Sequence, residues 1–599
     1  MRKVFLYLAG MALVVSCARQ KEKIPPAENM EEASGKIIIY QAFTRLFGNT
    51  TQVNKPFGTA AENGVGKFND INDAALTSLR ELGATHIWYT GIIEHAVLTD
   101  YTAHGIPLDD ADVVKGRAGS PYAIKDYYDV NPDLAVSVPD RMKEFEALVD
   151  RTHAHGLKVL IDFVPNHVAR GYASDAKPAG VKDLGETDDK SFYFSPKNNF
   201  YYLPGESFKV PRGYRPLGPH GFPTLDGKFE ETPAKVTGND QFTSSPGVNE
   251  WFETVKLNYG VDIREGRQTH FDPIPDTWVK MRDILVFWAN KKVDGFRCDM
   301  AEMVPVEFWR WVIPQIKSVN PAIVFIAEIY NPDQYANYIN TGRFDFLYDK
   351  VLLYDTLRHL LAGRRSTADI HTVQQRLAPI NAHMLHFVEN HDEQRLASKF
   401  FAGDPWKGIP VMMVSATIDK GPVMIYFGQE VGEPGLEDEG FQGDDGRTTI
   451  FDYWGVPEHQ RWVNGGRYDG GLLTPEQRQL RQFYSDLLNL VKKNPAFTQG
   501  DYYDITRYNQ EAGNFGNDVH AFIRHAGAEK FLVVTSYNSE TKTVKIKIPG
   551  DVAGQMGLDL NETYIARDVI WREAEVGFDK NLTFSLVLRP YSAFIFKMK

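Results

Sequence analysis

The sequence has 599 residues, a mass of 67.8 kDa and a formal net charge of −12, from 66 Lys and Arg against 78 Asp and Glu. This length exceeds what one hydrophobic core normally organises, so more than one domain is expected. The fractions of hydrophobic (43%) and charged (24%) residues are those of a globular protein and exclude a mainly disordered chain. A negative surface repels phosphate groups, so nucleic acids and anionic lipids are disfavoured as main partners and a neutral ligand is expected.

The first residues, 1–17, have the pattern of an export signal. Arg2 and Lys3 precede an apolar stretch, residues 4–15, that is too short to cross a bilayer as a helix but suits the core of a signal peptide. The stretch ends in Val-Val-Ser-Cys, which resembles the lipobox of bacterial lipoproteins. The resemblance implies that Cys17 is acylated and holds an exported protein on a bacterial membrane, at the periplasmic face or the cell surface. A plain signal peptide with an incidental cysteine is the alternative.

Residues 18–35 are charged, contain proline and lack an apolar period, which predicts a flexible tether. The second cysteine of the chain is Cys298. If Cys17 carries lipid, no intrachain disulfide can form, and the fold depends on its hydrophobic core. The sequence also lacks the CxxC and HExxH motifs of common metal sites.

Short β-branched or aromatic runs alternate with amphipathic helical stretches through the middle of the chain. A helix followed by a glycine and a strand recurs, as where Gly156 separates a helical stretch from the run LKVLIDFV. Eight strands are expected: Lys36–Phe43, Ala84–Thr90, Leu157–Val164, Val293–Asp299, Ala322–Glu328, Phe344–Tyr348, Met384–Glu389 and Pro422–Gly428. Eight alternating strands predict a parallel (β/α)8 TIM barrel rather than a doubly wound sheet.

Two further segments fall outside this alternation. Residues 168–275 are rich in Gly, Pro, Asn and Tyr and are too long for a barrel connection, which predicts a small domain B inserted after the third strand. Residues 501–599 alternate apolar and polar side chains between turn signals, which predicts a C-terminal antiparallel β-sandwich. The barrel is then formed by residues 36–167 and 276–500.

Acidic and basic side chains follow the ends of four expected strands. They are Asp162, Asn166 and His167 after the third strand, Arg297 and Asp299 at the fourth, Glu328 at the fifth, and His391 and Asp392 after the seventh. A lone acid is usually a solvated loop residue. The carboxyl ends of barrel strands meet on one face, however, so these side chains are expected to converge there.

Such a cluster suits cleavage of a glycosidic bond, which needs a proton donor and a carboxylate nucleophile. Arg297 lies two residues before Asp299, so both side chains point to one face of the strand, and the guanidinium is expected to keep Asp299 ionised. Glu328 has to be protonated to act first as an acid. Cys298 then points toward the helix layer, where we interpret it as part of the core.

Four segments resemble the signature regions of the α-amylase family, glycoside hydrolase family 13: DFVPNH at 162–167, GFRCD at 295–299, AE at 327–328 and NHD at 390–392. The resemblance covers about residues 36–599. It implies a retaining mechanism in which Asp299 is the nucleophile, Glu328 the acid and base, and Asp392 the group that grips sugar hydroxyls in the transition state. It also implies five substrate-binding residues: Tyr122, Asp162, His167, Arg297 and His391. Tyr122 would stack under a sugar, or else pack at the barrel rim.

The chain departs from the calcium site of this family. Many members bind a structural calcium with the asparagine of the first region, an aspartate of the insert and a histidine four residues after the nucleophile. Here Asn166 is present, but Met303 takes the histidine position and Lys256 lies in the segment that would carry the aspartate. A thioether is a poor calcium ligand, and an ammonium group cannot bind calcium. We therefore expect no required cofactor, no metal at this site, and the charge of Lys256 in its place near Asn166.

The resemblance implies hydrolysis of α-1,4-glucosidic bonds in starch-like glucans or maltooligosaccharides. Alternatives are an α-glucanotransferase that uses the same covalent intermediate, and a non-catalytic glucan-binding protein, which the three intact acids disfavour. Glu302 replaces a lysine of many amylases, so preference for starch stays open. Two further segments have two interpretations each. The seven acids of residues 430–445 form a solvated surface, which we favour, or line the cleft, and the aromatic runs at 192–194 and 200–202 stack on sugar or form a core.

Overall fold

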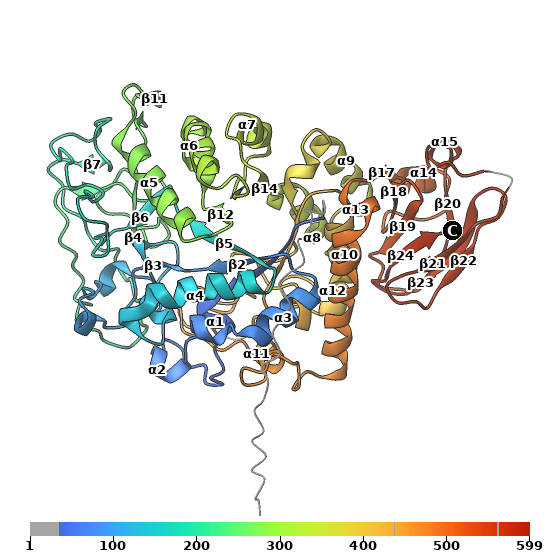
Figure 1. Ribbon diagram of the computed structural model, residues 1–599, viewed down its shortest axis with the longest axis horizontal. Helices are drawn as coiled ribbons and strands as arrows, with labels where there is room; N and C mark the ends of the chain where they lie inside the picture. Colours follow the sequence, from blue (N-terminus) through green and yellow to red (C-terminus); the bar gives the residue numbers. More distant parts are fainter. Residues whose placement is uncertain (1–34, 437, 560–561) are drawn as a thin grey trace, which may run out of the picture. The chain divides into compact units, whose positions relative to one another are not determined.

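Eight parallel strands form the central sheet of the computed structural model, which describes residues 35–436, 438–559 and 562–599 (Figure 1). They are β1 (Ile38–Phe43), β2 (His86–Thr90), β5 (Lys158–Phe163), β12 (Gly295–Cys298), β13 (Val324–Ala327), β14 (Phe346–Tyr348), β15 (Met384–Leu385) and β16 (Val423–Tyr426). From β1 to β15 each pairs with the next in this order, and β1 also pairs with β16. A parallel bridge between His386 and Val423 joins the two remaining edges. The predicted TIM barrel is therefore confirmed.

Helices lie on the outside of this barrel (Figure 1). They are α3 (Asp73–Leu82), α4 (Arg141–Ala154), α5 (Asp276–Asn290), α6 (Val306–Val319), α7 (Tyr335–Asn340), α8 (Asp355–Leu361), α9 (Ala368–Leu377), α10 (Ile409–Thr417) and α12 (Pro475–Lys493). Helix α3 buries Leu76, Leu79 and Leu82, which recur at helical spacing. Gly83 and Gly156 follow α3 and α4 with positive φ, a conformation that ends a helix at little cost in glycine.

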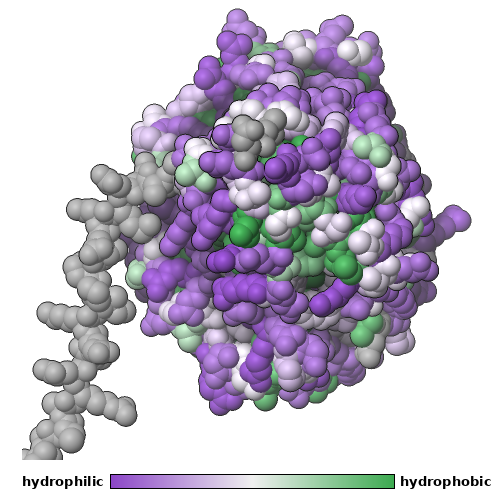
Figure 2. Space-filling view, turned by 90° about the vertical axis from the view of Figure 1, so that its right-hand side faces the viewer, coloured by the Kyte–Doolittle hydropathy of each residue, from purple (hydrophilic) through white to green (hydrophobic). Residues whose placement is uncertain are grey.

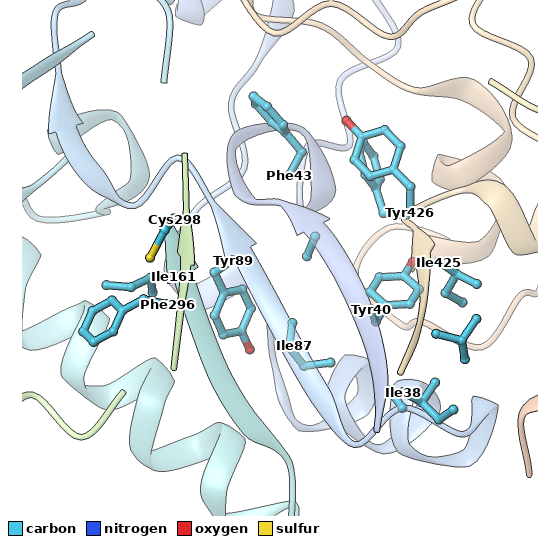
Figure 3. Packing of buried hydrophobic residues seen from close by; sticks show 14 of the residues in the cluster. Ile38, Tyr40, Phe43, Ile87, Tyr89, Ile161, Phe296, Cys298, Ile425 and Tyr426 are labelled. Carbon is cyan, nitrogen blue, oxygen red and sulfur yellow. The ribbon is translucent and has the colours of Figure 1, made fainter. Parts of the chain in front are cut away.

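The strands have two buried faces, because alternate side chains point into the barrel or toward the helices. Ile38, Tyr40, Ile87, Tyr89 and Phe296 belong to the large core outside the barrel (Figure 3). Cys298 is fully buried in that same core, as predicted. A second cluster fills the barrel: Ile39, Trp88, Leu160, Ile326, Tyr348, Tyr354, Leu385, Phe387 and Met424.

A buried ionic cluster lies where the barrel closes. Nε2 of His386 lies 2.6 Å from Asp419, and its Nδ1 lies 3.1 Å from Asp349. Burial alone would lower the pKa of His386, but Asp419 and Asp349 outweigh burial and raise that pKa to about 9. Lys36 donates to the carbonyls of Ala416 and Asp419 at 2.8 Å. The contact between His386 and Asp419 joins the end of β15 to the segment before β16, where backbone pairing is short. The contacts of Lys36 join the start of β1 to that same segment.

Residues 168–275 form short strand pairs around a small core. The pairs are β6 (His167–Ala169) with β9 (Thr254–Lys256), β7 (Tyr202–Leu203) with β8 (Ala234–Lys235), and β10 (Val261–Asp262) with β11 (Gln268–Thr269). Phe200, Tyr201 and Tyr202 are at most 3% exposed, so the second aromatic run belongs to a core. In the first run, Tyr193 and Phe194 pack against the core of the insert, whereas Phe192 is 58% exposed.

The C-terminal segment contains two antiparallel sheets. The larger has the order β17 (Asp501–Asp504), β18 (Val519–Ala526), β19 (Glu529–Ser536), β24 (Ala593–Met598), β21 (Ile565–Asp568) and β22 (Glu575–Gly577), and the smaller pairs β20 (Lys542–Lys547) with β23 (Thr583–Leu588). Ile523 and Leu532 from the first share one core with Ile546 and Leu586 from the second. This confirms the β-sandwich.

The face drawn in Figure 2 is mainly hydrophilic around a small hydrophobic area.

The interpretation of residues 430–445 as a solvated surface is wrong for three of their acids. Glu430, Glu433 and Glu439 are at most 4% exposed, and each accepts a hydrogen bond from the protein. The hydroxyl of Tyr40, for example, donates to Glu430 at 2.9 Å. These donors replace water, and so the carboxyl groups can be buried.

Among the described residues, none of the helices is both long and apolar enough to span a membrane. Cys17 and residues 18–34 of the expected tether lie outside the described part of the chain.

Candidate active site

The guanidinium of Arg297 connects acids from three neighbouring strands. It is fully buried, with Nη1 2.8 Å from Oδ1 of Asp299 and Nη2 2.9 Å from Oε1 of Glu328. Nη1 also lies 3.5 Å from Asp162, whose backbone is paired in register with that of Arg297. Because both terminal nitrogens belong to one rigid fork, the carboxyl groups of Asp299 and Glu328 lie well within the separation of about 10 Å that would exclude double displacement.

The charge of Asp299 differs from the expectation that Arg297 simply keeps it ionised. Burial and the neighbouring Glu328 raise the pKa of Asp299, and these effects outweigh the opposing attraction of Arg297. Glu328 also accepts hydrogen bonds from the Tyr330 hydroxyl (2.9 Å) and the Met300 amide (2.8 Å). Glu328 therefore places a second acid beside Asp299, and Asp299 retains a proton more readily than an isolated aspartate.

Asp392 lies in a more open position, with a side chain that is 38% exposed. Oδ2 of Asp392 is 3.0 Å from Nε2 of His391, and the amide of Gln41 donates to Nδ1 of His391 at 2.8 Å. Burial by itself would raise the pKa of Asp392, but His391 and Arg297 outweigh it and lower the pKa to about 2. Asp392 is therefore an anion at neutral pH that can accept hydrogen bonds from a ligand.

Aromatic rings surround the charged groups. The ring of Tyr122 stacks on His391 with a centroid distance of 5.2 Å, and its hydroxyl bonds to the same imidazole. Tyr122, Trp88 and Tyr348 each have their ring centroid 5.3 to 5.4 Å from Cζ of Arg297. These cation–π contacts fix the guanidinium, and the indole of Trp88 donates to Asp162 at 2.9 Å.

Sequence reasoning missed Trp88, Tyr348, Tyr330 and Gln41. A signal for three of them existed, because Gln41, Trp88 and Tyr348 occupy barrel strands that the sequence had located. Because side chains alternate between the two faces of a strand, their positions would have shown that they face the barrel interior. Nothing in the sequence, however, indicates that these rings meet Arg297.

His167 is buried beside Asn166. It is 3% exposed, its Nδ1 accepts a hydrogen bond from the Asn166 amide at 3.1 Å, and its ring lies 5.4 Å from that of Trp251. Burial, together with Lys256 and Lys115, lowers the pKa of His167 to about 3, so its ring is neutral.

Lys256 lies beside Asn166 at the junction of the insert and the barrel. Its Nζ is 2.5 Å from Oδ1 of Asn166, 2.8 Å from Asp240 and 3.4 Å from the carbonyl of Met303. The side chain is 5% exposed, and burial lowers its pKa. One ammonium group thus contacts three segments that are distant in the sequence.

A family model described as "Alpha amylase, catalytic domain" matches residues 41–452. The chain belongs to the alpha-amylase family. It is similar to "Alpha-amylase 3" of Dictyoglomus thermophilum, with 22% identity over 94% of this chain and 93% of the relative. It is also similar to a cyclomaltodextrin glucanotransferase of Geobacillus stearothermophilus, with 22% identity over 88% and 63% of the two chains.

The crystal structure of an alpha-amylase from Geobacillus thermoleovorans, complexed with acarbose, has the same fold. It superposes with a TM-score of 0.59 at 19% identity, covering 95% of this chain and 99% of that one. The chain is therefore an enzyme of a family that contains glycoside hydrolases and transglycosylases.

We expect Asp299→Asn to reduce kcat by at least about 10⁴-fold, because an amide is a poor nucleophile and the contact with Arg297 loses its charge. Activity is measured by the release of reducing ends from a soluble glucan. Asp333→Asn is the matched control, since the side chain of Asp333 is 79% exposed after β13, and it should keep full activity. Unchanged activity of Asp299→Asn would exclude Asp299 as the nucleophile.

Proposed function

We propose that the protein is a retaining enzyme that cleaves α-1,4-glucosidic bonds in starch-like glucans or maltooligosaccharides. The observation that carries the proposal is that the single buried guanidinium of Arg297 holds both Asp299 and Glu328. A retaining mechanism needs two carboxyl groups at short range on either side of one anomeric carbon.

In the first step a carboxylate oxygen of Asp299 bonds to the anomeric carbon while Glu328 gives its proton to the departing glycosidic oxygen. In the second step Glu328 takes a proton from water, the water oxygen bonds to the anomeric carbon, and Asp299 departs as a carboxylate. Asp392 remains ionised and accepts hydrogen bonds from sugar hydroxyls. These bonds stabilise the transition state most, since the hydroxyls beside a developing oxocarbenium ion are the stronger donors.

The remaining side chains position the sugar. Tyr122 offers an aromatic face for the apolar side of a glucose ring, and His391 keeps that face oriented through its stacking and hydrogen bond. Asp162 and Arg297 lie beside Asp299 and are expected to contact the sugar next to the reacting carbon. The neutral ring of His167 is expected to donate a hydrogen bond to the sugar.

An α-glucanotransferase is the second candidate, because one relative carries that activity in its name. In a transferase a sugar hydroxyl replaces water in the second step, and the same acids serve both reactions. A non-catalytic glucan-binding protein is disfavoured, since the chain has the complete set of three acids.

Incubation with maltoheptaose separates the two candidates. We expect a hydrolase to release new reducing ends in proportion to the maltoheptaose consumed and to yield chains no longer than seven glucose units. The measurement combines a reducing-end assay with chromatography of the products. Longer chains without a rise in reducing ends would contradict hydrolysis and establish transfer.

We propose that catalysis needs no metal at the usual calcium position of the family and that the charge of Lys256 serves there. Its contacts with Asn166, Asp240 and the Met303 carbonyl support this, because an ammonium donates where a calcium ion would accept. Protein stripped with a chelator should keep its activity at 25 °C. Lys256→Met should lower the free energy of unfolding by about 3 kcal/mol, since it leaves buried partners unpaired.

Denaturant unfolding measures this loss, with the exposed Lys228→Met as the control. The proposal would be wrong if chelation abolished activity and Asp240→Asn prevented recovery when calcium was returned.

We propose that Cys17 carries a lipid anchor and that the enzyme works on a bacterial membrane, at the periplasmic face or the cell surface. The lipobox-like segment supports this proposal. Cys17→Ser should move the protein from the membrane fraction to the soluble exported fraction with its kcat unchanged. Membrane retention of the variant would contradict lipidation.

A further inference from the structure

Four acidic side chains gather where the hairpin of β3 (Ile93–His95) and β4 (Ile124–Val130) meets the start of the insert. They are Glu94 on β3, Asp126 and Asp129 on β4, and Asp175. The carboxylate oxygens of Glu94, Asp129 and Asp175 lie within 4.8 Å of one another. We call these four residues the hairpin acidic cluster, and the mechanism above uses none of them.

Glu94 is the residue of the cluster that has a buried oxygen without a hydrogen-bond partner among the described residues. It is 2% exposed, and its Oε2 is buried without a hydrogen-bond partner in the part of the chain that the structure describes. A buried carboxylate oxygen without a donor is costly, so such an atom calls for an explanation. A carboxylate oxygen of Glu94 lies within 4.8 Å of oxygens of Asp129 and Asp175.

Two nearby cations offset only part of the charge of the cluster. Arg141 pairs with Asp129 of the cluster at 2.9 Å, and Lys125 lies 3.1 Å from Asp109, which is outside it. Asp126 accepts hydrogen bonds from the Ser174 hydroxyl (2.6 Å) and the Ala176 amide (2.8 Å). These contacts leave the cluster with more negative than positive charge, and Glu94 faces that excess.

We propose that Glu94, Asp129 and Asp175 bind a divalent cation of the calcium class. Calcium bonds to oxygen at about 2.3–2.6 Å, so oxygens on opposite sides of the ion are up to about 5 Å apart, which accommodates this group. The flexible coordination of calcium tolerates carboxylates that also accept other hydrogen bonds. Asp175 is exposed, so the ion can enter from solvent and complete its shell with water.

Such an ion connects two parts of the molecule. Glu94 and Asp129 belong to the β3–β4 hairpin, and Asp175 belongs to the insert. Tyr122 lies two residues before β4, so the ion braces the hairpin that leads to the sugar-stacking residue. This position is separate from that of Lys256, where an ammonium group already contacts Asn166.

Calcium titration of the chelator-stripped full chain tests the proposal, by calorimetry and by melting temperature. We expect the protein to bind calcium and its melting temperature to rise. Asp175→Asn should weaken binding at least about tenfold, because calcium affinity follows the number of charged ligands. As Asp175 is exposed, this variant should fold normally and melt like the wild type in chelator.

Glu94→Gln should abolish the rise in melting temperature, because it removes a charged ligand. It should not lower the melting temperature measured in chelator, since burial raises the pKa of Glu94 to about 9 and the metal-free carboxyl group is neutral like the amide. Asp226→Asn, an exposed acid elsewhere in the insert, and Asp240→Asn, beside Lys256, should bind calcium like the wild type. Absence of calcium binding would overturn the proposal. Glu94 would then be a buried neutral carboxyl group that binds no ion. Equal calcium binding by Asp175→Asn, Glu94→Gln and the controls would also overturn it.

Discussion

The buried guanidinium of Arg297 is the interaction on which the active site depends. A cation in a barrel interior is stable only when anions and other acceptors surround it, and here the anions come from β5 and from the residues that directly follow β12 and β13. The same contacts fix the positions of Asp299 and Glu328, because a planar fork has few ways to meet two carboxyl groups. The contacts that neutralise the charge of Arg297 are therefore the same contacts that position the catalytic acids.

That constraint leaves a surplus of negative charge. Asp162, Asp299 and Glu328 face a single positive group, and burial together with the neighbouring Glu328 raises the pKa of Asp299. Asp392 escapes this effect because His391 is its own partner and part of its side chain reaches solvent. The structure thus separates two kinds of acid: Asp299, which retains a proton more readily in the interior, and Asp392, an anion at the opening.

Buried charges also join segments elsewhere in the molecule. His386 links the acids beside β14 and β16 where the barrel closes, and Lys256 links the insert to Asn166. In both places a long-range ionic contact occurs where backbone pairing is short. Such contacts are costly to break, because each leaves an unpaired charge in a dry environment.

The sequence by itself determined the order of the eight strands, the place of the insert and the identity of the acids at the strand ends. These follow from local patterns, since helix caps, strand alternation and βα spacing are written in neighbouring residues. Tertiary structure alone decided that Trp88 and Tyr348 frame Arg297 and that Glu430, Glu433 and Glu439 are buried. Within the described part of the chain, it also left Oε2 of Glu94 without a hydrogen-bond donor. Those outcomes depend on which donors and rings approach from distant parts of the chain, and no local pattern encodes that approach.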